Sequence, residues 1–295
     1  MSTQLGVGFA LLAALALAVQ SVSVQRSTTH QPLSDVITVV FLVNLLVMVP
    51  VTVGLFFPAF DLTLLSIGAF ATGGILGSLL ARIALFVGIV RLGASRAEPL
   101  KSTFPLVAVL IAVVALGEAL TATVVAGVLL VVIGGAAVSW DAQAVQTGGT
   151  RQRRWVDVGF PLAAALLLGV DPVFTKIGLE TGTSPIVATT VRVIAAAAVF
   201  ACYRLWKRFR ARTPGRLLVT RWSFTAGIAN TVYLLAYLAA LGRAPVSLVT
   251  PILGVSPLLV LAISPFVSAR EERITIRLGI AVTILVAGVV LVLSG

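Results

Sequence analysis

The chain has 295 residues, of which 59% are hydrophobic and 11% are charged, and its formal net charge is +11. A soluble domain of this length could not hide so much apolar surface from water, so the composition excludes a soluble protein and indicates a bilayer. The single Cys202 excludes a disulfide framework and the single His30 a histidine metal cluster, and no metal or other cofactor is expected.

Ten apolar segments have about the 20 residues that a helix needs to cross a bilayer. In chain order they cover residues 5–24, 36–57, 62–90, 97–116, 121–140, 156–179, 185–205, 222–241, 246–267 and 276–293. The third is longer than a straight crossing requires, so we expect it to tilt or to begin after its first turn. The amino-terminal MSTQLG lacks the positive region of a secretory signal, so the first segment is predicted to be a membrane helix.

The fourth and fifth segments return in altered form as the ninth and tenth. Five positions coincide at an offset of 152: Pro99 with Pro251, Pro105 with Pro257, Ser95 with Ser247, Thr123 with Thr275, and Gly127 with Gly279. Helical hairpins alone would not place five such residues in one register, so we infer a duplication. The polar linker 141–155 divides a first repeat, residues 1–140, from a second, residues 156–295.

Each repeat holds five segments, an odd number, so the two repeats must enter the membrane from opposite sides. The predicted fold class is therefore an all-α membrane protein of ten helices built as two inverted five-helix repeats, an architecture of many secondary transporters.

The basic residues cluster between the apolar segments. Of 21 Lys and Arg, 17 lie in or beside the odd-numbered connections, and only Lys176 and Arg243 lie near even-numbered ones. The positive-inside rule then places the odd connections in the cytoplasm and both termini outside. Because this clustering is typical of loop charges that set membrane orientation, nucleic-acid binding is not expected.

Three stretches carry a resemblance to a known family: PLKSTFPLVAVLIAVVALGE, TPILGVSPLLVLAISPFVSAREE and DPVFTKIGLETGTSPIVATTVR. The chain resembles the EamA-type, ten-helix branch of the drug/metabolite transporter superfamily. Lys176, Ser184-Pro185 and Arg192 match that family's Lys near a helix end, Ser-Pro at the next helix and Arg inside it. Gln25 and Phe41 stand where Lys176 and Arg192 would map in the first half, so those charges are not duplicated.

The resemblance implies a permease of the inner (cytoplasmic) membrane that moves a small metabolite, such as an amino acid or a related compound, outward. It also implies both termini in the cytoplasm, because family members commonly place them there. That orientation conflicts with the charge count, and the sequence leaves it open.

Ionisable residues inside a membrane helix cost about 2.5–3.5 kcal/mol each at the centre, so they need partners or water. Arg82, deep in the third segment, either lines the substrate pathway or snorkels toward the basic end of its helix. Its helix also carries small residues at four-residue spacing, which favours close packing: Ala69, Gly73, Gly77 and Ala81. Arg192 either binds an anionic substrate or pairs with an acidic residue across the bundle.

Asp171 and Pro172 are predicted to interrupt the sixth segment, because proline removes a backbone donor. Broken helices near the midplane are where such transporters bind substrates, although Pro172 alone would also produce a simple kink. Asp171 adds a charge that a kink does not require, which favours a functional site.

The fourth segment offers a second candidate. Glu98 and Lys101 are three residues apart and flank Pro99, so they share a face and can pair. They either lie on the central pathway or form an ordinary pair at the membrane surface. Pro99 and the corresponding Pro251 of the ninth segment are predicted to break their helices, and near Pro251 lie only the neutral Ser247 and Thr250.

Asn230, Tyr233 and Tyr237 form one stripe of the eighth segment, which serves either packing or ligand binding. No Walker, G-x-S-x-G or paired-His motif is present, so the sequence does not predict an enzyme. The expected partners are a small-molecule substrate and the lipid bilayer, and homodimerisation is left open. A lipid-carrier or nucleotide-sugar translocator on the same fold, and a non-transporting membrane scaffold, are the alternatives.

Overall fold

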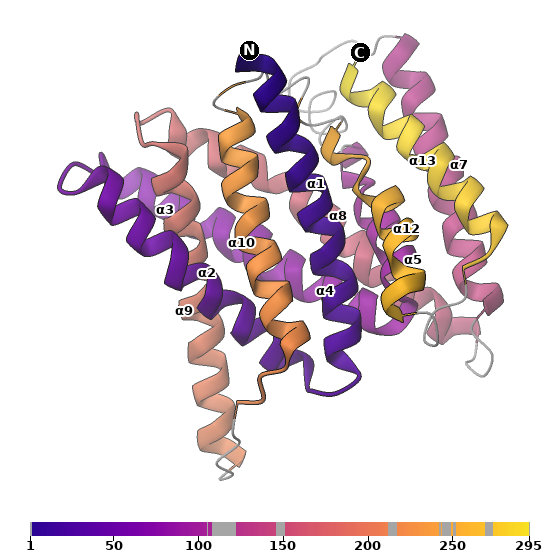
Figure 1. Cartoon of the computed structure of the whole chain (residues 1–295), viewed down its shortest axis with the longest axis horizontal. Helices are drawn as coiled ribbons and strands as arrows, with labels where there is room; N and C mark the ends of the chain where they lie inside the picture. The colour runs from indigo at the N-terminus through magenta and orange to yellow at the C-terminus, as the bar shows by residue number, and fades with distance from the viewer. Residues whose placement is uncertain are drawn as a thin grey trace.

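A computed structural model describes residues 2–104, 106–107, 122–145, 151–211, 217–241, 243, 249, 252–268 and 274–294. Every regular element in these ranges is helical (Figure 1). In chain order they are α1 (Ser2–Thr28), α2 (Leu33–Phe56), α3 (Leu64–Gly73), the π-helix η1 (Gly74–Ala81), α4 (Arg82–Leu92), α5 (Ala94–Lys101), α7 (Ala122–Val145), α8 (Arg151–Leu179), α9 (Pro185–Ala211), α10 (Arg221–Leu241), α12 (Ser256–Ser268) and α13 (Ile276–Ser294).

The third span is one long rod whose middle is π-helical. It comprises α3, η1 and α4 without interruption, from Leu64 to Leu92, and it runs obliquely behind α2 and α10 in Figure 1. Tilt accommodates its 29 residues in the bilayer. The rod ends at Gly93, whose φ of 86° favours glycine and turns the chain directly into α5.

The fourth and ninth spans are both broken, and at equivalent positions. α5 ends at Lys101 and is followed by a turn at Ser102 and Thr103, while Gly254 and Val255 form a turn before α12. The amide of Thr103 donates to Leu100 O (3.3 Å), and the amide of Val255 donates to Ile252 O (3.2 Å). These paired features lie 152 residues apart, the offset of the sequence repeat.

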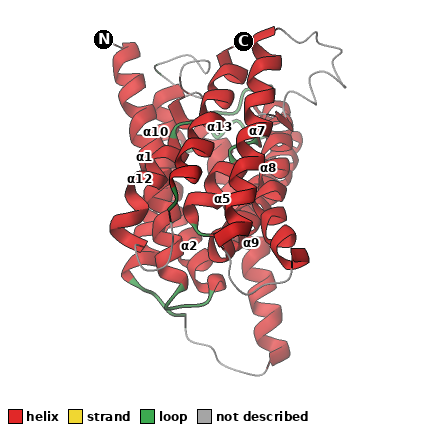
Figure 2. Ribbon diagram, turned by 90° about the vertical axis from the view of Figure 1, so that its right-hand side faces the viewer, coloured by secondary structure: helices red, strands yellow, loops and turns green. Residues whose placement is uncertain are grey.

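The first two spans repeat at offsets of 151 and 152 residues. α1 ends at Thr28 and α8 at Leu179, while α2 begins at Leu33 and α9 at Pro185. Both chain termini lie at one end of the bundle, and the basic end of α9 projects from the other (Figures 1 and 2). The predicted fold class, ten spans in two inverted five-helix repeats, is confirmed.

Two details of the prediction need correction. α8 continues through Pro172, where an interruption was predicted, because packing against the third span holds it helical on both sides. Helical structure also extends into the predicted linker 141–155: α7 continues to Val145, and α8 begins at Arg151. Residues 146–150 lie outside the described part of the chain.

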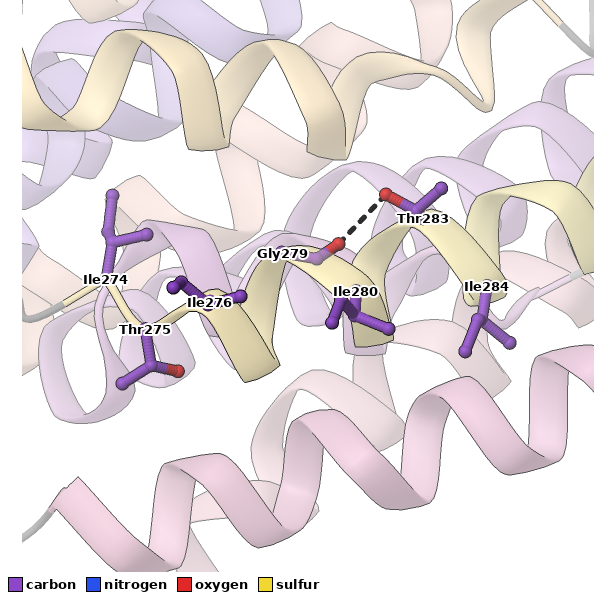
Figure 3. A pocket seen from close by; sticks show the side chains of 7 residues that line it. All are labelled: Ile274, Thr275, Ile276, Gly279, Ile280, Thr283 and Ile284. Atoms are coloured by element: carbon purple, nitrogen blue, oxygen red, sulfur yellow. Dashed lines mark hydrogen bonds between the residues drawn. The ribbon is translucent and has the colours of Figure 1, made fainter.

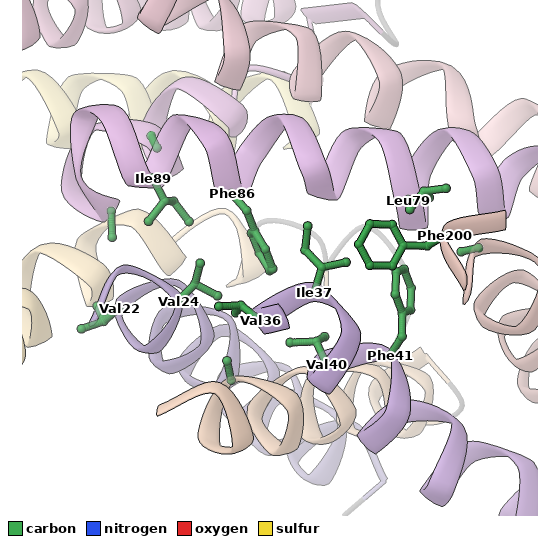
Figure 4. Close-up of a cluster of buried hydrophobic side chains, with 14 of the residues drawn as sticks. Val22, Val24, Val36, Ile37, Val40, Phe41, Leu79, Phe86, Ile89 and Phe200 are labelled. Carbon is green, nitrogen blue, oxygen red and sulfur yellow. The ribbon is translucent and has the colours of Figure 1, made fainter. Parts of the chain in front are cut away.

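The largest buried cluster joins the two halves. It is centred on α1, α2, the third span and α9 (Figure 4), and its aromatic members include Phe41, Phe86 and Phe200. The Phe41 and Phe200 rings pack with centroids 6.0 Å apart. Large apolar side chains also cover the outer surface, such as Leu64 and Phe266, which are 89% and 90% exposed, as a lipid-facing surface requires.

Glycine allows a close helix contact between α7 and α13. A Cβ on Gly134 would lie 2.6 Å from Leu285 N, and one on Gly288 would lie 2.6 Å from Val131 N. Both neighbours are backbone atoms, which cannot move aside as a flexible side chain would. The fifth and tenth spans therefore pack backbone to backbone, as small residues permit in membranes.

We expect Gly134→Ala to lower the thermal stability of the purified protein. The added methyl group meets the α13 backbone, and overpacking of this kind costs about 1–3 kcal/mol, more than the gain in helix propensity of about 1 kcal/mol. Gly159→Ala is the matched control, because a Cβ there meets nothing within 4 Å. Melting temperatures in detergent test this, and equal values for the two variants would contradict the backbone contact.

Candidate substrate site

A network of uncharged polar side chains connects three helices at mid-depth. Asn230 of α10 accepts a hydrogen bond at Oδ1 from Asn44 Nδ2 of α2 (2.7 Å) and donates through Nδ2 to Gln20 Oε1 of α1 (3.1 Å). Thr231 Oγ1 donates to Asn44 Oδ1 (2.8 Å). Asn44, Asn230 and Gln20 are all buried. Buried polar groups that satisfy one another in this way fix the relative positions of their helices.

Arg82 joins this network from the third span. Its Nη1 donates to Asn230 Oδ1 (2.8 Å), and its guanidinium lies 5.3 Å from the centre of the Phe41 ring. Arg82 is ten residues from the end of α4, about 15 Å along the helix. Its side chain turns into the bundle rather than along the helix toward the basic end. The snorkelling alternative therefore does not describe this conformation.

Arg192 of α9 pairs with Asp171 of α8. Arg192 Nη2 contacts Asp171 Oδ2, and Arg192 Nη1 donates to Thr175 Oγ1, one turn further along α8. Asp171 Oδ1 is buried and has no hydrogen-bond donor among the described residues. This pair resolves the question that the sequence left open: Arg192 has an acidic partner across the helix interface.

The glycines of the third span make room for this pair. A Cβ on Gly73 or Gly77 would lie within 3 Å of the Asp171 carboxylate, and one on Gly74 would lie 2.4 Å from Arg192 O. The small residues at four-residue spacing thus leave room for the Arg192–Asp171 pair as well as for close packing of a neighbouring helix. The π-helical segment coincides with this contact, and such segments recur at functional sites.

Tyr233 and Tyr237 lie about one turn apart on α10, the helix that carries Asn230. Their rings stack with centroids 5.9 Å apart and an interplanar angle of 17°. Both tyrosines lie within electrostatic range of Asp171 and Arg192, and Tyr233 also lies within range of Arg82. Both tyrosine side chains are half-buried, and Asn230, the third member of the stripe predicted on the eighth span, contacts Arg82 directly.

The repeat relates these residues to one another. At the offset of 151, Gln20 corresponds to Asp171, Phe41 to Arg192, and Arg82 to Tyr233. In the first half Arg82 lies beside the ring of Phe41, and at the equivalent positions the second half has an aromatic residue, Tyr233, and an arginine, Arg192. Only the second half adds a carboxylate, because Gln20 stands where Asp171 would map. The site is symmetric in position and asymmetric in charge.

Glu98 and Lys101 of α5 form a buried ion pair of 2.6 Å. Ser21 of α1 donates to Glu98 Oε1, and Ser21 is the neighbour of Gln20 along the chain. Gln25 Oε1 accepts from the amide of Ala94 (2.8 Å) and so caps the start of α5. The pair lies beside the mid-depth network on the side of the basic connections.

Several ion pairs that sequence reasoning missed lie near that same end. Arg96 binds Asp141 through two nitrogens (2.9 and 2.7 Å), and Thr275 donates to the other oxygen of Asp141. The remaining pairs are Arg91 with Asp157 and Arg204 with Asp35, at 2.6 and 2.7 Å. Each acid lies in the outer turns of a helix close to basic residues. That pattern could have identified these acids from the sequence, but it does not show which basic residue each acid binds.

Some predicted site residues are not brought together by the described structure. Ser247, Thr250 and Pro251 lie outside the described residues, and the side chains of Lys176 and Pro172 are also outside the description. The predicted helix break at Pro99 needs correction: Pro99 lies inside α5, which continues to Lys101, and the turn follows at Ser102.

An open groove of about 570 Å³ lies on the outer face of α13 (Figure 3). Its lining includes Ile274, Ile276, Ile280 and Ile284, and Thr283 donates to Gly279 O within the same helix (2.9 Å). Among the described residues, no ionisable side chain lines it. These features are typical of a surface that lipid chains cover, and the groove is not a candidate substrate site.

The chain belongs to the EamA-like transporter family, whose model matches residues 4–140 and 157–294, one match in each half. Together with the helical architecture, this defines a multi-pass membrane transporter of the drug/metabolite type. A solved structure described only as "Crystal structure of protein" shares the fold, with a TM-score of 0.65 and 17% identity over 98% of this chain and 95% of that one. No protein with a curated description matched.

We expect Glu98→Gln and Lys101→Gln each to lower transport in reconstituted liposomes. Each change leaves a buried charge without its partner, which costs more than removal of both charges. The double variant should therefore lose less than the sum of the two single losses. Additive losses would mean that the two side chains act independently, as in an ordinary solvated pair, and negligible losses would mean that transport does not need them.

Proposed function

We propose that the protein is a permease that exports a small metabolite, such as an amino acid or a related compound, across the inner (cytoplasmic) membrane. The observation that carries the proposal is the pair of equivalent helix breaks, at Ser102–Thr103 and Gly254–Val255. Discontinuous helices in matching positions of two inverted repeats are where secondary transporters bind their substrates. In this chain the first break lies against α8 at Gly169, two residues from Asp171.

Alternating access between the two halves is the proposed mechanism. Buried polar contacts cross between the repeats at mid-depth, as in Asn44 with Asn230, and nearer the helix ends, as in Thr52 with Thr190 (2.6 Å). Near the basic end, Arg204 of the second repeat pairs with Asp35 of the first, and Thr275 of the second repeat contacts Asp141, the partner of Arg96. Such contacts support a cycle in which rocking of one repeat against the other breaks one set and forms another.

The alternatives make different demands on the interior. A scaffold without transport activity has no use for Arg82, Asp171 and Arg192 at mid-depth, where each charge is costly. A lipid-carrier or nucleotide-sugar translocator would use the same fold with another substrate. The buried charges and the neighbouring tyrosines favour transport. Experiments must identify the substrate.

Counterflow in liposomes with purified protein tests the proposal. The panel contains radiolabelled amino acids, nucleosides, sugars and small carboxylates, and we expect uptake of at least one class. Asp171→Asn should lower that uptake about tenfold or more, because Arg192 loses the partner that positions it. Asp157→Asn is the matched control on the same helix, since its partner Arg91 is 41% exposed and such pairs contribute little.

Failure of every panel member to exchange, with folded protein in sealed liposomes, would move the assignment to a scaffold. Equal uptake by wild type and Asp171→Asn would place Asp171 in the supporting structure rather than in the transport site.

Orientation is a separate prediction, based on the charge distribution. With the exposed Cys202 replaced by Ala, a cysteine at Arg210 should be shielded from impermeant maleimide in intact cells, and one at Ala59 should be labelled. Arg210 lies in the last turn of α9, and Ala59 lies in the connection between α2 and α3. The reverse labelling pattern would instead place both termini in the cytoplasm.

A further inference from the structure

We infer that Arg82 binds the carboxylate of the transported substrate, and that this substrate is an organic monoanion with a planar apolar part. The inference rests on the proposed transport function and specifies the substrate class of that same site. Three observations carry it: the unneutralised charge of Arg82, its free donors, and the aromatic rings beside it.

Arg82 is a mid-depth cation without an anion. Within the described part of the chain, no carboxylate lies within ion-pairing distance of it. Its hydrogen-bond partner, Asn230, is neutral. The other mid-depth arginine, Arg192, is neutralised by Asp171. The described side chains of the site therefore carry one excess positive charge, and a bound monoanion would balance it.

The repeat indicates which group is missing. In the second half Asp171 supplies a carboxylate to Arg192, and in the first half the corresponding residue is the neutral Gln20. Gln20 and Arg82 both contact Asn230, so a substrate carboxylate at Arg82 would supply the negative charge that no described residue of the first half supplies there.

The guanidinium of Arg82 is fixed in position and still has unused hydrogen-bond donors. Of its five N–H donors, one is used in the bond from Nη1 to Asn230 Oδ1. Phe41 supports one side of the group. The remaining donors form the planar fork that binds a carboxylate through two parallel hydrogen bonds.

The stacked rings of Tyr233 and Tyr237 suggest the rest of the substrate. Tyr233 lies one turn from Asn230, the partner of Arg82, on the same side of α10, so an anion on Arg82 would lie near these rings. Flat apolar groups pack well against aromatic faces. A carboxylate attached to a planar group meets both features at once.

Three probes with one carbon skeleton separate charge from shape: 3-phenylpropionate, 3-phenylpropionamide and 3-phenylpropylamine. Binding is measured as the shift in melting temperature of the purified full-length protein over a range of probe concentrations. We expect the acid to bind the wild type about 10- to 100-fold more tightly than the amide, the range that charge-assisted hydrogen bonds provide. The amine should bind more weakly still.

Two variants test whether Arg82 is the cause. Arg82→Gln should lose the preference for the acid. Asn230→Asp should lose it too, because it places a carboxylate against Arg82 Nη1 with almost no change of shape and so neutralises Arg82 without removing it. Arg210→Gln is the control for removal of a cation, because Arg210 is exposed at the end of α9. It should keep the preference of the wild type.

Equal binding of acid and amide by the wild type, no binding of any probe, or an acid preference that survives in Asn230→Asp would each overturn the inference. If the wild type exchanges amines or neutral solutes in the counterflow assay without preference for the acid, transport stands and the anion site fails. If the acid binds through Arg82 but no labelled compound exchanges, the site stands and the transport function fails.

Discussion

A charge inside a bilayer must find a partner, and this constraint organises the interior of the protein. Water cannot reach such a group from the lipid side, so a charge at the centre of a helix costs several kcal/mol unless protein atoms replace the water. The second half meets the requirement with an internal pair, Arg192 and Asp171. The first half holds its arginine with an amide and a ring, which leaves the charge itself unbalanced.

The duplicated architecture makes that difference meaningful. Two inverted repeats bring equivalent positions to a common axis, so Arg82 and Tyr233, or Gln20 and Asp171, occupy corresponding places in the two halves. A perfectly symmetric site would suit a symmetric ligand. The two halves have diverged. The second half contains the Arg192–Asp171 pair, whose charges cancel, and the first half contains Arg82, whose charge no described carboxylate balances.

Two further features shape the protein: close packing at glycines, and breaks in the fourth and ninth spans. Glycines let α7 approach α13 at Gly134 and let the third span receive the Asp171 carboxylate at Gly73 and Gly77. The turns after Lys101 and before Ser256 interrupt the fourth and ninth spans at equivalent depths. Unwound backbone at these turns exposes peptide groups, which is tolerated in a membrane only where protein or a water-filled cavity surrounds them.

Much of the fold could be predicted from the sequence, because apolar length and the register of prolines are local properties. Ten spans, their duplication and their inversion follow from counting apolar segments and matching Pro99 and Pro105 to their copies. The candidate residues Arg82, Asp171 and Arg192 also stand out, since a charge in an apolar segment needs no structure to be noticed.

Only the tertiary structure decided which groups meet. A membrane helix that is apolar on most faces has little periodic signal, so its sequence does not show that Arg82 turns toward Asn230. The continuity of α8 through Pro172, and the choice of Asp171 as the partner of Arg192, depend on contacts between distant segments. Length and hydropathy determine that a helix crosses the bilayer, whereas its rotation about its own axis is set by the neighbours against which it packs.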